Sequence, residues 1–135
     1  MSIQRFLDAQ EPVIDQVVSE LAVGRKLTHW MWFIFPQYLY TGVKDSVMVD
    51  ASFIPSEKSV YYALADEAEV EDYWDNDTLR YRWTFCLDLL LIHRKRGKPL
   101  VDIFGKVDAM KIISSAAIFL PLSDYSDGDK LYFSE

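Results

Sequence analysis

The sequence predicts an all-α fold, a compact multi-helical single domain over residues 1–135 with about five to seven helices and no β-sheet of consequence. Hydrophobic residues recur at helical spacing in several segments, and residues that start or stop helices flank those segments. The 135 residues are 50% hydrophobic and 15% aromatic, so one domain of this length can bury a core without disulfides or a structural metal.

The first third of the chain predicts two or three helices. Residues 3–23 read as helix in two pieces, with Pro12 in the first turn of the second piece, where its missing N–H costs nothing. Gly24 is placed to end that helix in a left-handed cap. Thr28 is expected to be the N-cap of a further helix over 29–35.

The middle of the chain contains the clearest helix. Residues 40–42 suggest a turn, and residues 47–49 are a short apolar run of ambiguous type. Ser56 is then expected to cap a helix that continues into the acidic residues 66–72 as a solvated face or an extended helix end. Asn76 begins the central helix, whose predicted buried stripe is Leu79, Trp83, Cys86, Leu87, Leu90 and Leu91. The basic residues in the run 93–99 are expected to end this helix. A contact with nucleic acid is the less favoured explanation, because the run lacks interleaved aromatic residues.

The last part of the chain predicts a turn and one more helix. Gly105 permits the turn, and Asp108 is expected to cap a helix that runs to residue 120. The polar tail is expected to be ordered only if Tyr132 and Phe133 dock on the rest of the molecule.

Charge and composition narrow the function classes. A net charge of −7 makes a nucleic-acid partner an unfavoured prediction, since such a surface repels phosphates. The start of the chain lacks a secretion signal and no apolar run approaches the ~20 residues of a membrane span, so we expect a cytoplasmic protein without a membrane partner. The single cysteine, Cys86, is expected to be a buried small hydrophobe, and neither a metal nor a cofactor is predicted.

The segment from Arg25 to Gln37 combines cations, an imidazole, an amide and four large rings within thirteen residues. Core packing is the first explanation for the rings as a group. The polar members invite a second explanation, a pocket in which the rings form walls and the charged groups orient an anion. For His29, binding and structure explain the residue equally well.

Several of these residues form a pattern. The chain resembles the bacterial family called domain of unknown function 1810 in four stretches. These are Arg5-Phe6 with Asp8-Ala9-Gln10, then Gly24-Arg25-Lys26, then His29 to Gln37, and finally Ile103-Phe104-Gly105 with Asp108, Lys111 and Ser114-Ser115. Some of its members carry a calpastatin label. The resemblance implies a compact helical domain and no established activity. This chain looks like a divergent, shortened member, because residues 38–42 replace a glycine-rich link, the acidic stretch 66–75 looks inserted, and the last helix is curtailed.

The first functional hypothesis is a site for a small anionic ligand, such as a nucleotide or an ADP-ribose-like molecule, built from the first segment and the Gly105–Lys111 helix start. The predicted ligand-binding residues are Arg25, Lys26, Trp30, Trp32, Gln37, Gly105, Lys111 and Ser114. If chemistry follows, His29 is the candidate acid or base and Asp102 or Asp108 its carboxylate partner. The sequence contains no nucleophile elbow, P-loop or dinucleotide fingerprint, so it leaves open whether the protein is an enzyme.

The alternative hypothesis is an acidic protein-interaction module or inhibitor, such as a phage or mobile element would encode. Its acidic segment 66–77 and exposed rings such as Tyr73 and Trp74 would bind a basic protein partner.

Overall fold

The computed structural model describes residues 2–39, 43–44, 47–48 and 56–134. Within these residues the chain forms nine α-helices, two 3₁₀ turns and one short pair of strands, which confirms the all-α prediction. The helices are α1 (Gln4–Gln10), α2 (Ile14–Val23), α3 (Met31–Ile34), α4 (Glu57–Tyr61), α5 (Glu67–Asp75), α6 (Asp77–Lys95), α7 (Leu100–Phe104), α8 (Lys106–Phe119) and α9 (Asp127–Lys130).

The two strands, β1 (Val43–Lys44) and β2 (Val47–Met48), pair antiparallel, with Val43 opposite Met48. They are too short to change the fold class. The turn predicted at 40–42 and the last residue of the predicted apolar run 47–49 lie outside the described residues.

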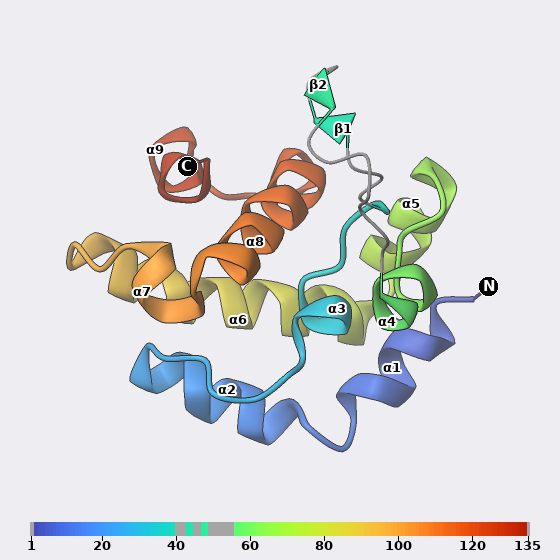
Figure 1. Ribbon diagram of the computed structural model, residues 1–135, viewed down its shortest axis with the longest axis horizontal. Coiled ribbons are helices and arrows are strands. Elements are labelled where there is room, and N and C mark those ends of the chain that lie inside the picture. The colour runs from blue at the N-terminus through green and yellow to red at the C-terminus, as the bar shows by residue number, and fades with distance from the viewer. Residues whose placement is uncertain (1, 40–42, 45–46, 49–55, 135) are drawn as a thin grey trace.

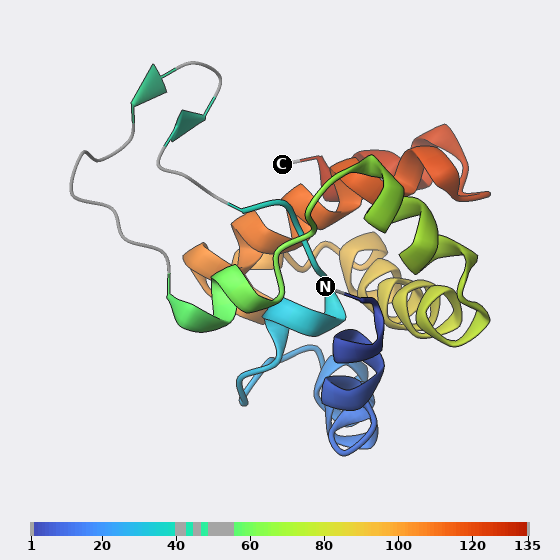
Figure 2. The same cartoon turned by 90° about the vertical axis from the view of Figure 1, so that its right-hand side faces the viewer.

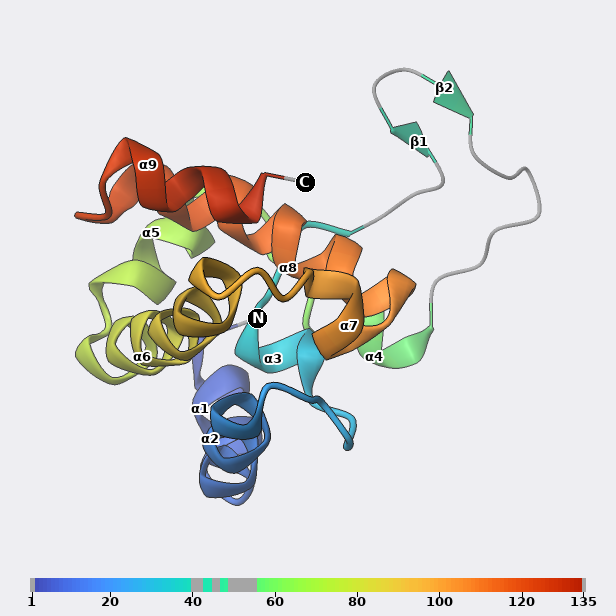
Figure 3. The same cartoon turned by 90° about the vertical axis from the view of Figure 1, so that its left-hand side faces the viewer.

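The other helices are arranged around α6, which runs through the middle of the molecule (Figure 1). It packs against α1, α2 and α5, and α8 packs against α5 and α7. Figures 2 and 3 both show α3 between the α1–α2 pair and α8, which agrees with its contacts to α1 and α8. No helix in the described ranges combines the length and the apolar character that crossing a bilayer requires.

Trp83 on α6 is the centre of the core. Its ring is fully buried and meets the rings of Phe35, Trp74 and Phe119 at centroid distances of 6.1, 5.5 and 5.5 Å. Its indole N–H donates to Ser115 Oγ at 3.1 Å, so the polar end of this large side chain is also satisfied. The six residues of the predicted buried stripe are all buried, which confirms the central helix.

The predicted helix boundaries that depend on local chemistry are largely confirmed. Ser56 accepts from the Ser59 N–H and Asn76 from the Leu79 N–H, so each acts as an N-cap. Gly24 ends α2 with φ of 87°. The prediction for Pro12 was wrong, because α2 starts at Ile14 and the proline lies in the preceding turn.

The helix count exceeds the predicted five to seven because several helices have only four or five residues. The predicted continuation of the Ser56 helix into the acidic stretch was also wrong. Two helices form there, and Asp66 caps the second by accepting from the Glu69 N–H at 2.9 Å.

The basic end of α6 binds neighbouring segments of the chain. His93 Nε2 lies 2.9 Å from the Leu21 carbonyl oxygen, and Lys98 Nζ donates to the Gly24 carbonyl at 2.7 Å. Arg94 donates to the carbonyl oxygen of Tyr132, which helps to hold the tail in place. Within the described residues these bonds are structural, as the helix-end interpretation predicts.

Candidate functional site

The two sequence segments predicted to form a site do meet. The Lys26 N–H donates to the Ile103 carbonyl at 2.9 Å, and Lys26 Nζ lies 2.9 Å from Asp108 Oδ2. The Trp30 and Phe104 rings pack edge to face at 6.3 Å. The loop after α2 is therefore fixed to α7 and to the start of α8.

A buried carboxylate, Glu20 on α2, holds this loop in shape. Its Oε1 accepts the N–H groups of Leu27 and Thr28 at 2.6 and 2.9 Å and the indole N–H of Trp30 at 3.1 Å. Its Oε2 accepts the Thr28 hydroxyl at 2.5 Å and the Gln16 amide at 3.0 Å. Five donors converge on one side chain that is only 3% exposed.

The charge of Glu20 is stabilised by these neutral donors, since no basic side chain of the described residues lies within ion-pair distance of it. Burial alone would raise the pKa of this carboxyl group. Hydrogen bonds from the Thr28 side chain and from the Thr28 and Leu27 N–H groups outweigh burial and lower the pKa to about 2. Thr28 is committed to Glu20, so the prediction that it caps a helix was wrong, and α3 starts only at Met31.

The two tryptophans of the segment have different environments. Trp30 is 1% exposed and its N–H is bonded to Glu20, so it is a core residue with almost no surface for the predicted ligand contact. Trp32 is partly exposed, and Lys58 Nζ and Lys111 Nζ lie 5.0 and 5.2 Å from its ring centroid. Its indole nitrogen is buried without a hydrogen-bond partner among the described residues.

Positive charge therefore gathers around Trp32. Asp108 lies between Lys26, at 2.9 Å, and Lys111, at 3.4 Å, so one carboxylate is shared by two ammonium groups. With Lys58 the group has three cations and one anion, a net charge of +2 on a chain whose total is −7. We call these residues the Trp32 cluster: Lys26, Trp32, Lys58, Asp108 and Lys111. Asp108 does not cap α8 through its side chain, which corrects the predicted role.

The remaining predicted residues show no shared geometry for catalysis among the described residues. Exposed positions are Arg25, His29, Asp102 and Gly105, and partly buried positions are Gln37 and Ser114. In the part of the chain that the structure covers, no hydrogen bond joins His29 to either candidate carboxylate, and no group of three or more histidine, cysteine or acidic residues could hold a metal ion. Two cavities, of about 740 and 620 Å³, open along α6, and none of the predicted site residues lines them.

Sequence reasoning missed two residues of this region, Glu20 and Lys58. A signal for Glu20 was available, because it lies beside Leu21 and three residues after Val17, both buried on the same face of α2. An acid in the last turn of a helix is unfavourable unless specific donors bind it. Nothing in the sequence near Lys58 indicates Trp32, which is 26 positions away and reaches it only through the fold.

The acidic segment presents exposed carboxylates, but it lacks the exposed rings that the interaction-module hypothesis names. Tyr73 is fully buried, and Trp74 stacks on Phe119 at 5.4 Å and donates to the Leu122 carbonyl. Glu69 is 7% exposed and pairs with Arg5. The prediction of exposed rings in this segment was wrong, because α5 supplies part of the core.

Comparison with known proteins agrees with this picture of the fold. The family model described as protein of unknown function (DUF1810) matches residues 1–132. A crystal structure of the conserved hypothetical protein Rv1873 from Mycobacterium tuberculosis is similar, with a TM-score of 0.76 and 32% sequence identity over 97% of this chain and 83% of that one. No curated protein matches the chain. Since the family model spans nearly the whole sequence, the chain belongs to the DUF1810 family of proteins of unknown function.

Proposed function

We propose that the protein binds a small anionic ligand at the Trp32 cluster. The observation that carries the proposal is the placement of two ammonium groups, Lys58 and Lys111, at about 5 Å from one partly exposed tryptophan ring. Like charges repel, so a fold that brings two lysines to one ring leaves a site that an anion stabilises.

Phosphate is the anionic group that suits this arrangement best. Lysine binds phosphate as a mobile point charge, and the two side chains approach the ring from different helices, α4 and α8. Lys26 is 8% exposed and held by Asp108, so it is expected to add a fixed positive field and not a direct contact. Arg25, exposed on the neighbouring loop, is the further cation that a second phosphate would reach.

A nucleotide or an ADP-ribose-like molecule is the ligand class that uses every part of the cluster. Lys58 is exposed and lies 5.0 Å from the ring centroid of Trp32. A phosphate that draws its ammonium group aside would free a tryptophan face for an aromatic base, and base stacking of this kind contributes about 1–3 kcal/mol. The indole N–H of Trp32 has no hydrogen-bond partner among the described residues, so a ligand that reaches it would find a further donor. Any catalytic role for His29, Asp102 or Asp108 remains a prediction that depends on this binding.

The test is a titration of tryptophan fluorescence with inorganic phosphate, AMP and ADP-ribose. We expect AMP and ADP-ribose to bind more tightly than phosphate, and Trp32→Phe to remove the fluorescence change. Lys58→Ala and Lys111→Met should each weaken binding about tenfold, the effect of losing one charge-assisted contact.

Lys106→Ala is the matched control, because Lys106 is an exposed lysine on α8 that is not among the lysines at the Trp32 ring. Circular dichroism should show unchanged helix content in all variants. Absence of binding for all three compounds at millimolar concentration would contradict the proposal, and so would equal affinities of the Lys58, Lys111 and Lys106 variants.

A further inference from the structure

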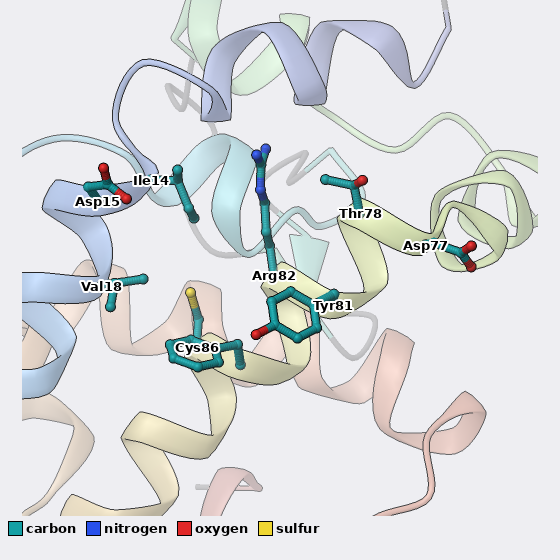
Figure 4. Close-up of a pocket in the computed structure, with 9 residues that line it drawn as sticks. Ile14, Asp15, Val18, Asp77, Thr78, Tyr81, Arg82 and Cys86 are labelled. Atoms are coloured by element: carbon teal, nitrogen blue, oxygen red, sulfur yellow. The ribbon is translucent and has the colours of Figure 1, made fainter.

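A concave site lies between the first half of α6 and the start of α2. The cavity has a volume of about 740 Å³, which is in the range of small-molecule sites. Ile14 and Val18 of α2 face Arg82 and the Cys86 thiol across it, and Asp77 and Thr78 lie at the far end (Figure 4). None of its lining residues belongs to the Trp32 cluster.

The walls of this cavity are apolar and aromatic. Tyr81 and Phe85 are 65% and 39% exposed, and their ring centroids lie 5.8 Å apart at an interplanar angle of 31°. Cys86 lies at the floor, where burial raises the pKa of its thiol to about 12 and keeps the group neutral. An occupant would therefore meet hydrocarbon and ring surface on most sides.

The charges at the rim are biased toward negative. Of the described residues that line the cavity, Arg82 is the one basic residue, and its guanidinium pairs with Glu11 at 2.6 Å. Asp15 has no ion-pair partner among the described residues. Asp77 pairs with Arg80, but its side chain is highly exposed. Among the described residues, Asp15 is thus the one carboxylate lining the cavity that has no cationic partner, and Tyr81 and Phe85 line the same cavity.

From this combination we infer that the α2–α6 cavity binds a protonated amine that carries a compact apolar or aromatic body. The rings would contact the body and attract the ammonium group through their faces, and Asp15 would pair with its charge. This inference is independent of the Trp32 cluster and concerns a ligand of the opposite charge.

The experiment is a two-dimensional NMR titration of the whole chain with 2-phenylethylamine, 2-phenylethanol and 3-phenylpropanoate, which share a ring and differ in charge. We expect the amine to bind about tenfold more tightly than the alcohol, as one cation–π contact and one partly exposed ion pair would give. The shifted resonances should belong to α2 and α6. The carboxylate should bind most weakly.

Two variants locate the interaction. Asp15→Asn should reduce the preference for the amine over the alcohol to about threefold, the part that the cation–π contact supplies, and Tyr81→Ala should weaken both ligands. Tyr61→Ala, which removes another exposed tyrosine on α4, is the control and should change neither affinity. Equal binding of amine and alcohol, preference for the carboxylate, shifts outside α2 and α6, or no binding at millimolar concentration would each overturn the inference.

Discussion

Replacing Glu20 with glutamine should destabilise the protein strongly at neutral pH and much less in acid. The carboxylate accepts five hydrogen bonds in a buried position, so the folded state favours its charged form. A glutamine has a similar shape but is neutral, and its amide group would face donors where the carboxylate presents a second acceptor.

The magnitude follows from the pKa. A fall from the ordinary 4.5 to about 2 is a shift of about 2.5 units, and at ~1.36 kcal/mol per unit this stabilises the folded protein by about 3 kcal/mol. Because the folded-state pKa is lowered, the stabilisation is fully present above pH 4.5 and disappears as the pH falls toward 2. At pH 3 roughly half of it should remain.

The assay is urea unfolding at pH 7 and pH 3, followed by circular dichroism, for the wild type and for Glu20→Gln. The free-energy difference should be about 3 kcal/mol at pH 7 and roughly half of that at pH 3. Glu71→Gln, at an exposed position of α5, is the control and should change stability by less than about 0.5 kcal/mol at both pH values. A difference below about 1 kcal/mol that does not vary with pH would refute the assigned role of the charge.

Three further predictions concern the core and the loop. Arg5→Lys should lower the free energy of unfolding in urea by about 3 kcal/mol or more. Arg5 binds Glu69 through two nitrogens and also donates to three backbone carbonyls, and lysine cannot reproduce that geometry. A variant as stable as the wild type would contradict this. Gly24→Ala should lower the melting temperature through a loss of about 1–3 kcal/mol, since φ is +87° and a Cβ would lie 2.9 Å from the His93 ring; an unchanged melting temperature would show that the loop adapts freely. Cys86 should react with a thiol reagent at pH 8 far more slowly in the folded protein than in denaturant, because burial raises its pKa to about 12, and equal rates would place the thiol at the surface.

The parts of the fold that the sequence predicts are those set by local chemistry. The central helix follows from hydrophobic spacing, and its start at Asn76 follows from a side chain that bonds three residues ahead. Asp66, followed three residues later by Glu69, is a similar signal that went unrecognised, which is why the break between α4 and α5 was missed.

The helix expected over 29–35 shows why the rest could not be predicted. Thr28 is a good N-cap by type, and in isolation its hydroxyl would accept from the next turn. Here it donates to Glu20, whose carboxylate also takes the N–H groups of Leu27 and Thr28. A carboxylate eight residues earlier in the chain competes with the local cap, and the loop stays non-helical until Met31.

The sequence predicts the candidate site only in part, because some of its contacts depend on the fold and not on local chemistry. The contact between Lys26 and Asp108 connects two segments that the sequence identifies separately. Lys58, however, reaches Trp32 only because α4 packs beside α3 and α8, and its own surroundings in the sequence carry no functional signal. The orientation of Trp30 likewise depends on Glu20, which accepts its indole N–H, whereas the indole N–H of Trp32 has no partner among the described residues.

The polar groups of this region fall into two classes that mutation can separate. Arg5 and Glu20 are buried and bonded to several internal partners, so their loss should reduce stability whatever the protein binds. Arg25, His29 and Lys58 are exposed, and the fold does not require a cation or an imidazole at those positions. Substituting any of these three should leave the melting temperature nearly unchanged, so a variant among them that loses anion binding would report on the ligand alone. The Glu20 variant should lose both, because the loop that Glu20 holds also places the lysine bound to Asp108.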